Sequence, residues 1–399
     1  MKKKILFVMN NLNCGGAEKA LISLLDTIDY TMYDVDLLLM KHEGLFLNKI
    51  PSSVNLLEEP TGYKYFDMSV KSALVDCIKK GRLDIAISRL LAGIIIKTEK
   101  NRVRCEQRVW KYISKSLKHI NKNYDIAVGY LEKTPIYFCV DKVNACKKIG
   151  FIHNDYDKLG MDPLLDRPYF EKLENVVTVS EECGNILKNR FPMYDEKVKI
   201  MHNIVSASTI NKMSLEERVL SEDEIKIEDE IKIVSVGRLN HQKGFELAIE
   251  TCKELVQKGY IIKWYIIGEG EDREKLERMI SLNNLQETFI LMGIKENPYP
   301  YIREADIYVQ PSRFEGKSIA IDEAKILRKP IVLTNFSTAK DQITNNENGL
   351  IVDMNSKALY EGIASLIDNS ALRERFSLRL SNENLGTESE INKLYEMFQ

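Results

Sequence analysis

Residues 231–249 read IKIVSVGRLNHQKGFELAI and carry the pattern that decides the fold. The first six are rich in β-branched side chains and predict a buried strand, Gly237 ends it, and a helix is expected from Phe245. The start of the chain repeats this plan, because the strand-like KKILFV at 3–8 leads through a Gly-Gly pair at 15–16 into a helical segment. Two such openings predict two α/β units, each built on a parallel sheet.

Apolar runs typical of buried strands recur along both halves of the chain and alternate with helical patterns. Because parallel strands need crossover connections, this alternation predicts parallel sheets packed against helices. The expected strands lie near 4–9, 34–39, 54–57, 125–129, 148–152, 176–179, 198–201, 231–236, 261–267, 288–292, 306–309, 330–333 and 349–352.

The length of 399 residues is typical of two domains. The stretch 203–230 is polar and contains an acidic run from Ser221, as linkers and surface insertions do. We therefore expect a hinge there, with domains at 1–204 and 205–380. An amphipathic helix is expected within the remaining segment, 381–399.

Arg238 and Lys243 share the loop that follows the predicted strand 231–236. Loops after parallel strands line the ligand crevice of an α/β sheet. Two fixed cations in that position can neutralise a diphosphate and stabilise it as a leaving group. The alternative is a pair of exposed cations beside a helix.

A second charged loop reads FEGKSIAIDEA at 314–324. It follows a predicted strand, and it places Glu315 at the mouth of a helix and Glu323 about two turns inside that helix. The helix N-terminus offers N–H groups to a phosphate, and the two carboxylates can accept hydrogen bonds from sugar hydroxyls. The alternative is a surface loop with two solvated glutamates.

These loops resemble the motifs of family 4 glycosyltransferases, which are retaining enzymes. Four parts match that pattern in order, namely Gly-Gly-Ala-Glu at 15–18, His153 after a mid-chain strand, Gly-Arg…Lys-Gly at 237–244 and Glu-x7-Glu at 315–323. The resemblance implies the GT-B fold, in which two Rossmann-like α/β domains face each other across a cleft. It also implies that the C-terminal helix crosses back to the first domain.

The resemblance implies a role for each matched residue. His153 and Glu315 would be the catalytic residues and face the transferred sugar, while Glu323 would bind the ribose. The sequence departs from the family at Lys317-Ser318, where an aromatic residue or Gly is often followed by Pro or Leu, so the donor is not carried over. The implied substrate-binding residues are Gly15, Gly16, Gly237, Arg238, Lys243, Gly316, Lys317, Ser318 and Glu323.

By this resemblance the chain would be a retaining hexosyltransferase of bacterial surface-polysaccharide synthesis. It would move a hexose or N-acetylhexosamine from a nucleotide-sugar, with UDP expected, to a lipid-linked or polysaccharide acceptor. Two alternatives come from other classes. One is a non-catalytic GT-B partner of an active transferase, and the other is a nucleotide-sugar epimerase.

The composition limits where in the cell the protein is expected and which classes of partner it is expected to bind. A net charge of −2 and a pI near 6.3 argue against a nucleic-acid binder. No apolar stretch approaches the roughly 18–20 residues of a membrane span. The seven cysteines form no C-x-x-C pair, which favours reduced thiols and a cytoplasmic location, peripheral to the inner face of the membrane.

No metal or other cofactor is expected. Asp-x-Asp occurs at 34–36 and at 155–157, but the first begins a predicted strand and the second lies just after His153. None of the five histidines has metal-ligand spacing to another histidine or to a cysteine pair. We expect Arg238 and Lys243 to neutralise the diphosphate in place of a metal ion.

The segment 78–118 departs from the rest of the sequence. It carries twelve Lys or Arg residues against three acidic ones, a local net charge of +9 in a slightly acidic chain. Within it, 85–96 is strongly apolar. A basic amphipathic helix of this kind predicts contact with an anionic membrane surface. The alternative is a helical hairpin packed on the first sheet with a solvated basic face.

Overall fold

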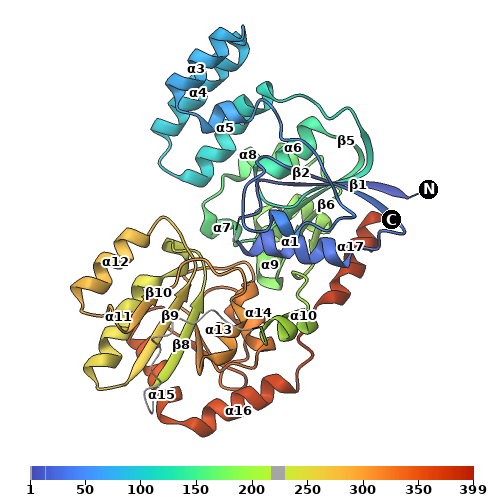
Figure 1. The fold of residues 1–399 in the computed structure, drawn as a ribbon. Coiled ribbons are helices and arrows are strands. Elements are labelled where there is room, and N and C mark those ends of the chain that lie inside the picture. The colour runs from blue at the N-terminus through green and yellow to red at the C-terminus, as the bar shows by residue number, and fades with distance from the viewer. Residues whose placement is uncertain (1, 14, 217–229) are drawn as a thin grey trace. The chain divides into compact units, whose positions relative to one another are not determined.

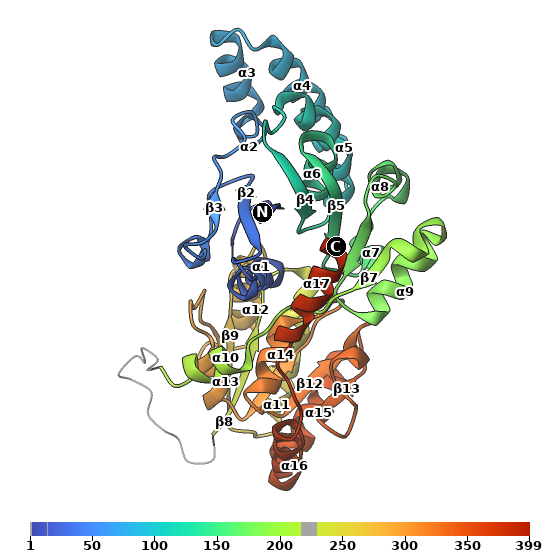
Figure 2. The same cartoon turned by 90° about the vertical axis from the view of Figure 1, so that its right-hand side faces the viewer.

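The computed structural model describes residues 2–13, 15–216 and 230–399 (Figures 1 and 2). These residues form two compact units. The first combines Met1–Asn13, Ala17–His202 and Glu390–Gln399. The second holds Asn203–Ser389 together with the short loop that ends at Gly16.

The unit boundaries can be set beside those expected from the sequence. The chain passes between the units after His202 and after Ser389, whereas the sequence placed the boundaries after 204 and after 380. Most of the acidic run in the expected hinge falls within 217–229 and lies outside the described residues.

The first unit is built on a seven-stranded parallel sheet in the order β3-β2-β1-β4-β5-β6-β7. The sheet grows in one direction from β1 to β3 and in the other from β4 to β7. Its switch point therefore lies between β1 and β4, where an open α/β sheet forms its ligand crevice. The strands are β1 (Lys3–Met9), β2 (Tyr33–Leu39), β3 (Asn55–Leu56), β4 (Asn123–Gly129), β5 (Asn144–Ile152), β6 (Asn175–Thr178) and β7 (Val198–Ile200).

The second unit is built on a six-stranded parallel sheet in the order β10-β9-β8-β11-β12-β13. By the same reasoning its switch point lies between β8 and β11. Two parallel α/β sheets were expected, and every predicted strand is present, with most ends within two residues. The strands are β8 (Ile231–Val236), β9 (Ile262–Ile267), β10 (Phe289–Leu291), β11 (Ile307–Gln310), β12 (Ile331–Thr334) and β13 (Leu350–Val352).

Each sheet has its own buried core of aliphatic and aromatic side chains, formed with the helices that pack on it. The helices of the first unit are α1 (Gly16–Thr27), α2 (Lys64–Asp67), α3 (Val70–Lys79), α4 (Leu83–Thr98), α5 (Arg102–Ser116), α6 (Thr134–Lys142), α7 (Tyr156–Leu159), α8 (Pro163–Phe170), α9 (Glu181–Arg190) and α17 (Ile391–Phe398). Those of the second are α10 (Ala207–Met213), α11 (Phe245–Gln257), α12 (Arg273–Leu282), α13 (Tyr299–Glu304), α14 (Ile319–Ile326), α15 (Ser356–Asp368) and α16 (Ser370–Ser381).

The C-terminal helix α17 packs within the first unit. Tyr395 stacks on Tyr33 with ring centroids 5.2 Å apart, and its hydroxyl accepts a hydrogen bond from the backbone of Asp29. The Lys3 ammonium donates to the backbone oxygen of Phe398 at 2.7 Å. The last eight helical residues of the chain thus complete the unit that the first strand begins.

Helices α3 and α4 stand off from the first sheet (Figures 1 and 2). They share a small apolar cluster with α2 that is separate from the main core. Arg89 of α4 is buried and donates to the backbone oxygens of Tyr65 and Met68, each at 2.8 Å, which ties α4 to the end of α2. None of the described helices has both the length and the apolarity to cross a membrane.

A buried carboxylate ties four helices of the first unit together. Asp166 of α8 accepts hydrogen bonds from Tyr137 of α6, from Tyr156 of α7 at 2.5 Å and from Gln107 of α5 at 2.9 Å. Burial outweighs these bonds and raises the pKa of Asp166 to about 6. Because the folded state favours the protonated acid, this contribution to stability is fully present below about pH 4 and is lost as pH rises through about 6.

We expect Asp166→Asn to flatten this part of the pH dependence. Between about pH 4 and pH 7 the wild type should lose up to about 3 kcal/mol from this group, because each pKa unit is worth about 1.4 kcal/mol. The measurement is urea unfolding followed at Trp110 in a Trp264→Phe background, since these are the two tryptophans of the chain. Asp195→Asn, at an exposed position, is the control. An unchanged pH dependence in Asp166→Asn would contradict this account.

Candidate functional site

The two charged loops expected from the sequence follow β8 and β11, which are neighbours in the second sheet. Arg238 and Lys243 lie between β8 and α11, with a short 3-10 turn at His241–Lys243. Glu315 lies between β11 and α14. Both loops thus leave the carboxyl edge of the sheet at its switch point, the place where α/β sheets bind ligands.

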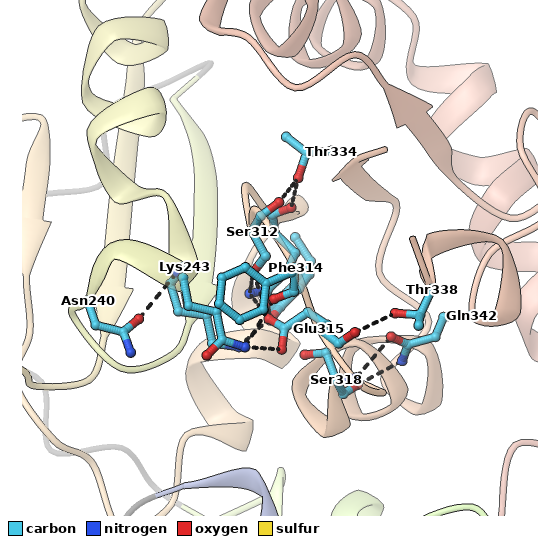
Figure 3. A network of polar contacts seen from close by, with 12 residues as sticks. Asn240, Lys243, Ser312, Phe314, Glu315, Ser318, Thr334, Thr338 and Gln342 are labelled. Atoms are coloured by element: carbon cyan, nitrogen blue, oxygen red, sulfur yellow. Dashed lines mark hydrogen bonds and ion pairs between the residues drawn. The ribbon is translucent and has the colours of Figure 1, made fainter. Parts of the chain in front are cut away.

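A buried ion pair joins these loops (Figure 3). The Lys243 ammonium lies 2.5 Å from Oε1 of Glu315, and their side chains are 14% and 7% exposed. The same carboxylate oxygen accepts a hydrogen bond from the Ser312 hydroxyl at 2.7 Å. Gln242 donates to the other oxygen at 3.3 Å and to the backbone oxygen of Phe314 at 3.0 Å. The carboxylate is therefore held by a cation and by neutral donors at once.

Further buried side chains hold the loop of Glu315 in place. Thr338 donates to the backbone oxygen of Glu315 at 3.1 Å, and Thr334 donates to that of Ser312 at 2.5 Å. Gln310, the last residue of β11, accepts from the Tyr308 hydroxyl at 2.7 Å and donates to the Ser312 hydroxyl at 2.8 Å. These hydrogen bonds hold the backbone and side chains around Glu315, so the position of its carboxylate does not depend on the conformation of its loop alone.

Two glycines make the Lys243 geometry possible. A Cβ atom at Gly237 would lie 2.9 Å from Cε of Lys243, so the lysine side chain lies across the space that glycine leaves open. Gly244 has a φ of +66°, and a Cβ there would meet the backbone oxygen of Pro311 at 2.2 Å. The Gly-Arg…Lys-Gly spacing is thus required by the close approach of the loops after β8 and β11.

Ser318 is the N-cap residue of α14. Its backbone N–H, which the resemblance gave to the donor, is donated to Oε1 of Gln342 at 2.9 Å. Gln342 also donates to the backbone oxygen of Ser318 at 2.8 Å, and both groups are buried. These two hydrogen bonds fix the start of α14. Gly316 and Lys317 lie in the loop just before it.

Glu323 lies at the fifth position of α14, just over one turn inside it rather than the expected two turns. Its side chain is buried, and Oε1 accepts a hydrogen bond from the Tyr299 hydroxyl of α13 at 3.2 Å. Glu315 therefore lies in the loop four residues before α14, and Glu323 lies just past the first turn of that helix.

Arg238 and Arg313 give the site two further cations. Arg238 is exposed in the loop after β8. Arg313 donates to the backbone oxygen of His241 at 2.7 Å and pairs with Glu246 at 2.8 Å, so it joins the two loops a second time. Sequence reasoning missed Arg313.

His153 follows β5 in the first unit and is buried. Its ring packs against those of Tyr130 and Phe151, with centroids 4.9 Å and 5.8 Å away. Its backbone N–H donates to the buried carboxylate of Glu132 at 3.2 Å, a residue that sequence reasoning did not select. Gly15 and Gly16 lie where the loop after β1 meets the start of α1.

Both Asp-x-Asp sequences have structural roles. Asp36 is buried and accepts from Tyr124 at 2.6 Å and from Lys122 at 2.8 Å. Asp155 caps α7, and Asp157 pairs with Arg190 at 2.9 Å. Among the described residues, no three His, Cys, Asp or Glu side chains are grouped so that they could hold a metal ion.

Comparison with known proteins shows what the chain is similar to. Residues 217–379 match the family model of the glycosyl transferases group 1. Over its full length the chain superposes on TarM of Staphylococcus aureus, solved in complex with UDP and other ligands, with a TM-score of 0.68, 16% identity and 100% of each chain covered. It also superposes on HepE of Anabaena in complex with UDP-glucose, with a TM-score of 0.69, 14% identity and coverage of 99% and 98%.

The chain has the fold of the GT-B glycosyltransferases. Two relatives are similar in sequence. The poly(ribitol-phosphate) alpha-N-acetylglucosaminyltransferase of S. aureus is 24% identical over 72% of this chain and 61% of its own length. The N-acetylgalactosamine-N,N'-diacetylbacillosaminyl-diphospho-undecaprenol 4-alpha-N-acetylgalactosaminyltransferase of Campylobacter jejuni is 26% identical over 59% of this chain and 62% of its own length. The chain thus spans about three-fifths of the length of these relatives.

The ion pair predicts coupled stabilities in this GT-B protein. We expect Lys243→Met to lower the free energy of unfolding of the second unit by about 3 kcal/mol, because it leaves a buried carboxylate without its cation. The double variant Lys243→Met/Glu315→Gln should lose less than the sum of the two single losses, by about 2 kcal/mol. Urea unfolding followed at Trp264 in a Trp110→Phe background measures both quantities.

The control for this cycle is Lys357→Met, which removes a lysine 4.0 Å from Glu361 where both side chains are largely exposed. It should change stability little. Single losses from Lys243→Met and Glu315→Gln that simply add would show that the buried contact is not coupled.

Proposed function

We propose that the chain is a hexosyltransferase that moves a hexose or N-acetylhexosamine from a UDP-sugar to a lipid-linked or polysaccharide acceptor in cell-surface glycan synthesis. The relatives' names support this class, since they describe transfer to poly(ribitol-phosphate), to a diphospho-undecaprenol-linked sugar and in capsular polysaccharide biosynthesis. The observation that carries the proposal is the buried Lys243–Glu315 pair at the switch point of the sheet that matches the family.

In this proposal the pair changes partners when the donor binds. The diphosphate draws the Lys243 ammonium toward its oxygens, and the exposed Arg238 adds a second cation. Glu315 then has a carboxylate oxygen for the hydroxyls of the sugar, while Ser312 and Gln242 still hold it. Glu323, one turn further along α14, serves the ribose. Gly316, Lys317 and Ser318 complete the proposed set at the start of α14, where the backbone N–H of Ser318 donates to Gln342.

We propose transfer with retention and without a metal ion. Lys243 and Arg238 neutralise the charge that develops on the leaving diphosphate, as a divalent cation does in other sites. The leaving diphosphate then accepts the proton of the acceptor hydroxyl on the same face of the sugar, and His153 contributes a polar surface toward it. The protein supplies position and electrostatics to this step.

The acceptor and the location belong to the same proposal. A nucleotide-sugar donor and unpaired thiols suit the cytoplasm, and the described cysteines form no disulfides. A lipid-linked acceptor would bring the enzyme to the inner face of the membrane.

The deciding experiment offers UDP-, GDP- and ADP-hexoses and N-acetylhexosamines with a polyprenyl-diphosphate-linked sugar and measures nucleotide release and glycan product. We expect one UDP-sugar to give both, with the anomeric configuration retained and with the rate unchanged in excess chelator. An epimer formed from donor alone would indicate an epimerase, and no turnover with any donor would favour a non-catalytic partner. Loss of transfer in chelator that Mg²⁺ or Mn²⁺ restores would reject metal independence.

A second experiment tests the diphosphate contact. Arg238→Gln should weaken UDP binding by about 10- to 150-fold, because a charge-assisted hydrogen bond contributes about 1.5–3 kcal/mol. The control is Arg278→Gln, which changes an exposed arginine of α12 in the same unit. Isothermal titration with UDP and with uridine separates the roles, since uridine lacks the diphosphate and should bind both variants equally. Equal UDP affinity in Arg238→Gln and the wild type would remove Arg238 from the site.

A further inference from the structure

Exposed apolar side chains gather on the α3–α4 hairpin of the first unit. Of the nineteen exposed large hydrophobic residues in the described part of the chain, eight lie between positions 75 and 96. A gathering of this kind marks an interaction surface, whereas single exposed hydrophobic residues do not. The eight are Val75, Ile78, Leu83, Ile87, Leu90, Leu91, Ile94 and Ile96.

Helix α4 is apolar on two opposite faces. Its buried face, which includes Ile85 and Ala92, packs inward. The opposite face carries Leu83, Ile87, Leu90 and Ile94 at spacings of four, three and four residues, with exposed fractions from 48% to 61%. At 100° per residue these four form one stripe, and no charged residue falls within it. A solvated helix face is normally polar, so this stripe lacks its partner.

The neighbouring helix α5 carries a basic stripe with the same spacing. Arg104, Arg108, Lys111 and Lys115 lie within about 60° of one another around the helix axis, and α4 packs against α5. Arg108 pairs with Glu99 at 2.9 Å. Glu106, the one acidic residue in the α5 sequence, points away and pairs with Lys133 at 2.6 Å. The exposed cations of this row, Arg108, Lys111 and Lys115, therefore lie on the helix that packs against α4.

The chemistry of the two stripes selects the partner. A second copy of the chain would bring two basic rows together, which like-charge repulsion disfavours. Protein interfaces are anchored by Trp, Tyr and Arg in pockets, but the α4 stripe is built only from Leu and Ile. An aliphatic stripe beside lysine and arginine is the pattern of a helix that lies in the interface of an anionic bilayer.

We propose that α4 and α5 dock the first unit on an anionic lipid surface. The α4 stripe enters the boundary between headgroups and acyl chains, and the α5 cations contact lipid phosphates. Docking itself needs no donor or acceptor. Its use, which is to bring the site to a lipid-linked acceptor, rests on the proposed transferase function.

The test is co-sedimentation of the full chain with phosphatidylcholine vesicles, with and without phosphatidylglycerol, at low and high salt. We expect binding to the anionic vesicles that weakens as salt rises, because the screening length falls to about 3 Å at 1 M. A salt-resistant part should remain because the apolar stripe is inserted. Equal binding to both vesicle types, or binding to neither, would overturn the proposal.

Two double variants separate the electrostatic contribution to vesicle binding from the apolar contribution. Lys111→Gln/Lys115→Gln should weaken binding about thirtyfold, at roughly fivefold per cation, and should remove much of its salt dependence. Ile87→Ser/Ile94→Ser should abolish the salt-resistant part, at roughly tenfold per residue. All four positions are exposed, so the fold should be unaffected.

Matched controls lie in the second unit. Leu282→Ser/Leu378→Ser removes two leucines that are 82% and 66% exposed, and Lys253→Gln/Lys258→Gln removes two exposed lysines. These variants should bind as the wild type does. If they lose as much as the α4 and α5 variants, the binding is non-specific and the proposal is wrong.

Two further readouts separate the remaining outcomes. Sedimentation velocity without lipid would reveal a dimer, and a dimer that Ile87→Ser/Ile94→Ser dissociates would mean that a second copy covers the stripe. Nucleotide release with a water-soluble acceptor tests the chemistry without a membrane. Vesicle binding without any sugar transfer would support the docking surface and reject the proposed function. Sugar transfer without vesicle binding would support the proposed function and reject the docking surface.

Discussion

The Lys243–Glu315 contact is the interaction on which the site depends, because it joins loops that are 72 residues apart in sequence. The two residues meet because β8 and β11 are neighbours at the switch point of the sheet. Gly237 and Gly244 then let the loops approach closely enough for a 2.5 Å contact. A buried ion pair is costly unless further donors surround it. Ser312 and Gln242 are those donors, so the polar network follows from the pair.

In this arrangement the Lys243 ammonium and the Glu315 carboxylate are each other's counterion. A diphosphate competes for the ammonium, whereas sugar hydroxyls compete for the carboxylate. One donor molecule that carries both groups can replace the pair as a unit, while a phosphate or a sugar alone would leave one partner buried without its counterion. In the proposed function the pair therefore favours a ligand with an anion and a polyol at a fixed separation, which is the chemistry of a nucleotide-sugar.

Local pattern was enough to predict the strands, the two sheets and the loops with Arg238, Lys243 and Glu315, since buried parallel strands are short apolar runs and these loops lie where they end. It was not enough to find Gln342. Its side chain reaches the backbone of Ser318 from 24 residues away, and only the folded chain brings them together. Arg313 was missed for another reason, because nothing in its neighbours distinguishes a cation that joins two loops from an exposed one.

In helix α4 the structure adds information that the sequence pattern did not contain. The run 85–96 is apolar in sequence, and with its basic surroundings it predicted either contact with an anionic membrane or a hairpin packed on the first sheet with a solvated basic face. The structure buries one side, where Arg89 ties the helix to α2, and leaves the stripe from Leu83 to Ile94 exposed. The apolar residues of that stripe contribute nothing to the core of the unit that carries them. In the proposed docking these side chains gain free energy from a lipid surface outside the unit, and the cations on α5 favour a negatively charged surface.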